Sequence, residues 1–65
     1  MIVFIKVFDY ETGDPFLINV NMIESVTVTS GGSVIHITDH YYIVHDSLEQ
    51  IQKKIWKAQS WKGDN

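Results

Sequence analysis

Two segments of alternating apolar and polar residues flank a pair of glycines in the middle of the chain. Residues 25–30 read SVTVTS, residues 33–38 read SVIHIT, and Gly31-Gly32 separates them. A period of two places every second side chain on the same face of a β-strand. A glycine pair between two such runs favours a two-residue turn, because glycine tolerates positive φ. The sequence therefore predicts a β-hairpin at the centre of the fold.

A third strand extends this hairpin. Residues 41–46 read YYIVHD, and Asp39-His40 predicts a second two-residue turn before them. In the first hairpin, Ser30 is expected to lie opposite Ser33. With this register, one face of the three strands is apolar and forms the expected core face: Val26, Val28, Ile35, Ile37, Tyr42 and Val44. The other face is amphipathic and is either solvated or an interface: Thr27, Thr29, Val34, His36, Thr38, Tyr41, Ile43 and His45. A slip of one residue would mix the two sets.

The N-terminal part of the chain predicts two further strands. Residues 2–8 (IVFIKVF) are rich in β-branched and aromatic residues, and both faces of such a strand would be apolar. The turn-forming residues 10–15 precede a strand at 16–20. Asn19 or Asn21 can then cap a single helical turn. An apolar strand face that the chain itself leaves uncovered is expected to meet another subunit.

A C-terminal helix is predicted from its cap and its apolar stripe. Ser47 and Gln50 fit a capping box, in which each side chain pairs with the backbone N–H of the other residue. Spacings of three and four residues produce one apolar stripe up to about Gln59: Leu48, Ile51, Ile55 and Ala58. The predicted fold class is α+β, with a small antiparallel sheet or partly open barrel of about five strands in a meander and one amphipathic helix. Residues 1–59 are expected to form a single domain, and residues 60–65 a frayed tail.

Composition narrows the classes of function. The chain has 65 residues, of which 45% are hydrophobic, and no cysteine. A core of this size rarely contributes more than about 3–5 kcal/mol, so the remaining apolar surface favours association with another chain. The lack of cysteine excludes thiolate metal sites, cysteine nucleophiles and a disulfide scaffold, and indicates a cytoplasmic location. Lys6 and Asp9 interrupt the apolar N-terminal run too early for a membrane span.

We expect the protein to act without enzymatic activity, as a protein–protein interaction module that forms homo-oligomers, with a dimer favoured. The surface would combine the amphipathic sheet face, the spare face of the first strand and a tryptophan beside the helix stripe. The predicted interface residues are Phe4, Val34, His36, Tyr41, Ile43, His45 and Trp56. No metal ligand or cofactor is assigned. No catalytic residue is assigned either, because the candidate serine nucleophiles each have a structural reason to be in a turn or a cap.

A first alternative is a nucleic-acid-binding regulator that uses the second half of the helix. Lysines and tryptophans interleave there: Lys53, Lys54, Trp56, Lys57 and Trp61. Residues 53–65 carry four lysines against Asp64, which gives +3 in a chain of net charge −3. The acidic remainder and the complete absence of arginine argue against a nucleic-acid partner.

A second alternative is a small-ligand or metal site at His36 and His45. In the expected register these histidines lie diagonally on adjacent strands of the amphipathic face, where both imidazoles could approach one ion. Such a site would need a third ligand, for which the spacing of the sequence designates no residue.

The order of strands and helix, together with several short motifs, resembles the small FlbD-like flagellar and swarming-motility proteins of bacteria. The resemblance covers residues 16–55, through the segments FLIN at 16–19, IESV at 23–26, IHIT at 35–38, YIV at 42–44 and SLEQI at 47–51. The turn after Thr38 is one residue shorter than in that family, and the loop between the first strands is longer. The resemblance implies a small accessory protein without catalytic residues. The second half also resembles part of the LytTR-type DNA-binding domain, which is considerably longer and uses an arginine that this chain lacks.

Overall fold

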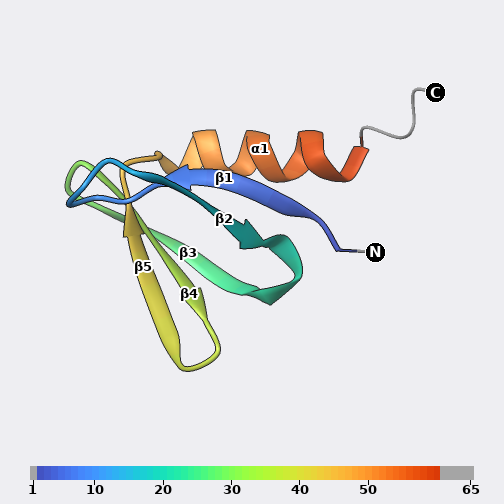
Figure 1. Ribbon diagram of the computed structural model, residues 1–65, viewed down its shortest axis with the longest axis horizontal. Helices are drawn as coiled ribbons and strands as arrows, with labels where there is room; N and C mark the ends of the chain where they lie inside the picture. The colour runs from blue at the N-terminus through green and yellow to red at the C-terminus, as the bar shows by residue number, and fades with distance from the viewer. Residues whose placement is uncertain (1, 61–65) are drawn as a thin grey trace.

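The computed structural model describes residues 2–60 (Figure 1). The elements follow the order β1 (Phe4–Phe8), β2 (Pro15–Asn19), the single 3-10 turn η1 (Val20–Met22), β3 (Ile23–Thr29), β4 (Gly32–Ile37), β5 (His40–Val44) and α1 (Leu48–Ser60). The predicted α+β class is confirmed. The helix ends one residue later than predicted, and residues 61–65 of the predicted tail lie outside the described residues. Within residues 2–60, no helix has the length and apolar character needed to cross a membrane.

The five strands form two antiparallel sheets that meet at one point. β1 pairs with β2 in the first sheet, and β3, β4 and β5 follow one another in the second. The sheets are joined by an isolated bridge between Asp9 and Val44. Beside it, the N–H of Tyr10 donates to the carbonyl of Ile43 at 2.9 Å, and the N–H of His45 donates to the carbonyl of Phe8 at 2.8 Å. The strands therefore curl around the core without closing into a barrel.

Consecutive strands pair within each sheet, as predicted for a meander, but β2 does not pair with β3. There the chain makes the single turn η1, which the sequence predicted from its asparagines. Asn19 caps this turn, because its Oδ1 accepts a hydrogen bond from the N–H of Asn21 at 2.9 Å. The turn redirects the chain into the second sheet, and β3 pairs with β4 instead of β2.

The turn of the first hairpin in the second sheet begins one residue earlier than predicted. Thr29 pairs with Gly32, so the turn residues are Ser30 and Gly31. Gly31 has a φ of 81°, a conformation that favours glycine. Gly32 lies in β4, where a Cβ atom would collide with the backbone carbonyl oxygen of Val44. The two glycines thus have different roles: the first makes the turn and the second permits a close backbone approach.

The turn between β4 and β5 is displaced in the same way, since Ile37 pairs with His40 and the turn residues are Thr38 and Asp39. In both hairpins the cross-strand partner of each residue is therefore shifted by two positions from the predicted one. Because two is an even number, the division of side chains between the two faces is unchanged.

The core lies between the sheets and the helix, and its buried hydrophobic side chains come from both sheets, η1 and α1: Ile5, Val7, Ile18, Val20, Ile35, Val44 and Ile51. Val26, Ile37 and Tyr42 of the predicted core face pack against this cluster. The prediction for Val28 was wrong, because this side chain is 70% exposed. Val28 lies near the end of the edge strand β3, opposite Ser33, whose buried hydroxyl occupies the inner position there.

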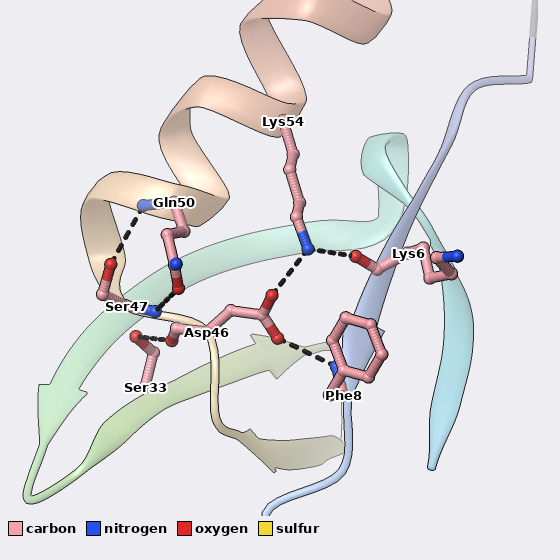
Figure 2. Close-up of polar contacts among 7 residues, drawn as sticks. All are labelled: Lys6, Phe8, Ser33, Asp46, Ser47, Gln50 and Lys54. Atoms are coloured by element: carbon pink, nitrogen blue, oxygen red, sulfur yellow. Dashed lines mark hydrogen bonds and ion pairs between the residues drawn. The ribbon is translucent and has the colours of Figure 1, made fainter. Parts of the chain in front are cut away.

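The predicted capping box starts the helix. The N–H of Gln50 donates to Oγ of Ser47 at 3.1 Å, and the N–H of Ser47 donates to Oε1 of Gln50 at 2.9 Å (Figure 2). From there α1 packs mainly along β1, with a smaller contact to β3 (Figure 1). Ile51 is fully buried, whereas Leu48 at the start of the stripe is 41% exposed.

Candidate interaction surfaces

Four of the predicted interface residues lie together on the face of the second sheet that points away from the core. In the observed register, His36 pairs with Tyr41 and Val34 pairs with Ile43. Tyr41 and Ile43 are 58% and 39% exposed, and Val34 and His36 are half-buried. Thr27 on β3 completes the patch, since it pairs with Val34. We call these five residues the outer strand face.

Contacts within the outer strand face hold its aromatic groups in place. Nε2 of His36 lies 3.4 Å from Oγ1 of Thr27, and its ring centroid lies 6.3 Å from that of Tyr41. His40 lies beside the same tyrosine at 6.5 Å. The face therefore combines aromatic and aliphatic groups with a few polar atoms at its border, the composition typical of the centre of a protein interface.

His45 lies apart from the outer strand face. Its ring stacks on Tyr10, with the ring centroids 4.9 Å apart. In the observed register the Val34–Ile43 pair lies between His36 and the row of His45. A separation of four residues along a strand corresponds to about 13 Å. Among residues 2–60 no group of three histidine, aspartate or glutamate side chains is placed to hold a metal ion.

The first sheet also exposes apolar side chains on its outer face. Phe4 of β1 and Leu17 of β2 are 52% and 61% exposed. Lys6 shares this face, because it follows Phe4 by two residues in β1 and pairs with Leu17 of β2. Its ammonium group lies 6.0 Å from the ring centroid of Phe8. This face is therefore apolar with a positive charge, in contrast to the outer strand face.

A buried aspartate connects the helix to the sheets (Figure 2). Asp46 is 5% exposed. Its Oδ1 accepts a hydrogen bond from the N–H of Phe8 at 2.8 Å, and its Oδ2 accepts one from Nζ of Lys54 at 2.6 Å. Its backbone carbonyl accepts from Oγ of Ser33 at 2.8 Å. Nζ of Lys54 also donates to the carbonyl of Lys6 at 2.6 Å.

These contacts give Lys54 a structural role that sequence reasoning missed. Its ammonium group donates to the backbone carbonyl of Lys6 in β1, three residues before the bridge between Asp9 and Val44 that joins the two sheets. A signal was present in the spacing, because Lys54 follows Ile51 by three residues and precedes Ala58 by four, on the face of the helix that meets the sheet. The hydrogen bond from the N–H of Phe8 to Asp46 joins residues 38 positions apart, so no local sequence pattern indicates it.

Of the other residues in the predicted nucleic-acid site, Lys53 and Lys57 are exposed and Trp56 is 70% exposed. Most of the Trp56 side chain is therefore accessible to solvent. Trp61 lies outside the described residues. The structure thus leaves two exposed lysines and one exposed tryptophan on the described part of the helix, while Lys54 is held against Asp46.

The loop between β1 and β2 is organised by Asp9. Its Oδ2 accepts hydrogen bonds from the N–H groups of Glu11 and Thr12, each at 3.0 Å. The bond from the backbone of Thr12 is the largest cause that holds the pKa of the Asp9 carboxyl below its ordinary value, and the neighbouring His45 contributes in the same direction. This carboxylate has a structural role within its own loop.

Comparison with known proteins agrees with the resemblance in the sequence. The family described as FlbD: Flagellar and Swarming motility proteins matches residues 4–61, which extends the resemblance at 16–55 in both directions. No curated protein and no solved structure matches the chain significantly. With nearly its whole length matched, the chain belongs to the FlbD family of flagellar and swarming motility proteins.

Proposed function

We propose that this member of the FlbD family is a non-enzymatic interaction module that forms a dimer through the outer strand face. The observation that carries the proposal is the exposure of Tyr41 and Ile43 beside the half-buried Val34 and His36. A strand face that remains in water normally carries polar residues at such positions. Aromatic and aliphatic side chains gathered on one face gain free energy when a second apolar surface covers them.

Three side chains that could take part in catalysis support a non-enzymatic function, because the fold already uses them. Oγ of Ser33 donates to a backbone carbonyl, and Oγ of Ser47 accepts the helix-capping hydrogen bond. Asp46 is paired with Lys54, which also makes that lysine a weak candidate for binding nucleic acid. A nucleophile or a general base needs a side chain that is available to a substrate.

The size of the outer strand face sets the expected affinity. Three strands about 4.8 Å apart, with a few residues of each in the patch, offer less area than the roughly 800 Å² per partner of a standard interface. We therefore expect a dimer that forms at micromolar concentrations and dissociates on dilution.

Sedimentation velocity over a concentration series tests this function. The wild-type chain should change from monomer to dimer as its concentration rises, and Ile43→Lys should remain monomeric. Met22→Lys is the matched control, because Met22 is 51% exposed in η1, outside the outer strand face. Circular dichroism of each variant verifies that it is folded. A wild-type chain that stays monomeric, or an Ile43→Lys variant that dimerises like wild type, would refute the proposal.

A further inference from the structure

We propose that the groove between β1 and α1 binds an acidic, amphipathic segment of another protein. The groove is lined by Phe4, Ile5, Lys6, Lys54, Lys57 and Ala58. It lies on a different part of the molecule from the outer strand face, so the inference does not rest on the dimer. Figure 2 shows two of these lining residues, with Lys54 reaching from the helix to the backbone carbonyl of Lys6 in β1.

The apolar part of the groove is exposed although the core beneath it is closed. Phe4 is 52% exposed, Ala58 is half-buried, and Ile5 below them is 4% exposed. An apolar side chain of a partner would cover the ring of Phe4 and the methyl group of Ala58. This requirement favours a protein segment over a nucleic acid, whose backbone offers phosphates and sugars and no aliphatic side chains.

The charged part of the groove is entirely positive. Three of its six lining residues are lysines and none is acidic. The ammonium group of Lys54 is paired with Asp46, the only ion pair within residues 2–60. Lys6 and Lys57 are exposed and keep their charge available to a partner. Lys6 also lies 6.0 Å from the ring centroid of Phe8, a contact that favours an ordered position for its ammonium group.

The arrangement fits a segment in which carboxylates flank one or two apolar residues. The carboxylates would approach Lys6 on one wall and Lys57 on the other, while the apolar residues fill the space against Phe4. Opposite charges at the border of such a contact raise the association rate and fix its register.

To test this proposal, the isotope-labelled full chain is titrated with a short synthetic peptide in which glutamate alternates with leucine. NMR spectra of the chain report the binding. The same peptide with lysine in place of glutamate is the control ligand. The amide signals of Phe4, Lys6, Lys57 and Ala58 should shift with the acidic peptide only. Lys6→Glu and Lys57→Glu should each weaken binding by about tenfold or more, because attraction becomes repulsion.

Lys53→Glu is the matched control variant, because Lys53 is an exposed lysine on the same helix that does not line the groove. It should change the affinity by less than about twofold, as expected of a charge outside the contact. Absence of shifts in the groove, equal binding of both peptides, or an equal effect of Lys53→Glu and Lys57→Glu would overturn the proposal. So would loss of self-association in Lys57→Glu without peptide, because a second copy would then be the occupant.

Discussion

Replacement of Asp46 by asparagine tests how the helix is attached to the sheets. Asparagine keeps an oxygen that can accept from the N–H of Phe8, but it removes the negative charge that faces Lys54 at 2.6 Å. A hydrogen bond to a charged group contributes about 1.5–3 kcal/mol, and a neutral one about half of that. Asp46→Asn should therefore lower the free energy of unfolding by about 1–2 kcal/mol. Asp46→Ala, which also leaves the N–H of Phe8 without its acceptor, should cost about 3 kcal/mol or more.

Urea unfolding followed by circular dichroism measures both changes. With a slope of about 1 kcal/mol per molar urea for a small domain, Asp46→Asn should lower the midpoint by about 1–2 M. Asp39→Asn is the control, since Asp39 is exposed in the turn before β5. In a Lys54→Met background the cost of Asp46→Asn should fall by about 1 kcal/mol, because the two groups interact directly. An Asp46→Asn midpoint equal to that of Asp39→Asn would refute the structural role of this ion pair.

Four further substitutions test two glycines, the helix cap and the loop after β1. Gly32→Ala should lower the free energy of unfolding in thermal melts by more than about 2 kcal/mol, because its Cβ meets the carbonyl of Val44. Gly13→Ala, with a φ of 77° but open space around it, should cost only about 1–2 kcal/mol; equal costs would contradict this. Ser47→Ala should cost about 1 kcal/mol in the same assay, and an unchanged melting temperature would show that the cap is dispensable. Because the folded pKa of Asp9 is lowered, its contribution is present above its ordinary value of 3.8 and lost as the pH falls through the lower folded value. Asp9→Asn should therefore make urea midpoints less sensitive to pH in that range, and parallel profiles for the variant and wild type would argue against the predicted linkage.

The parts of the fold that follow from neighbouring residues were predictable. The capping box of Ser47 and Gln50 spans four residues, and the cap of Asn19 on η1 spans three. The two faces of the second sheet follow from alternation alone, and they survived an incorrect register because the error was two residues.

The remaining features depend on contacts between distant parts of the chain. Gly32 is displaced from the turn because the backbone of β5 passes close to it, which nothing in residues 25–38 indicates. His45 lies against Tyr10 of the first loop, and the shifted register of β4 and β5 separates it from His36, so the two histidines are not diagonal neighbours as predicted. Lys54 was assigned to an exposed basic surface because its partners, Asp46 and the carbonyl of Lys6, come from outside the helix.

Contact between two copies of the chain through the outer strand face can be detected by NMR on a mixture of isotope-labelled and unlabelled protein. Isotope-filtered spectra detect only contacts between one copy and another. At concentrations where dimers predominate, we expect contacts between chains that involve the side chains of Tyr41 and Ile43. Contacts between chains that involve only other surfaces, such as Phe4 or Trp56, would contradict it.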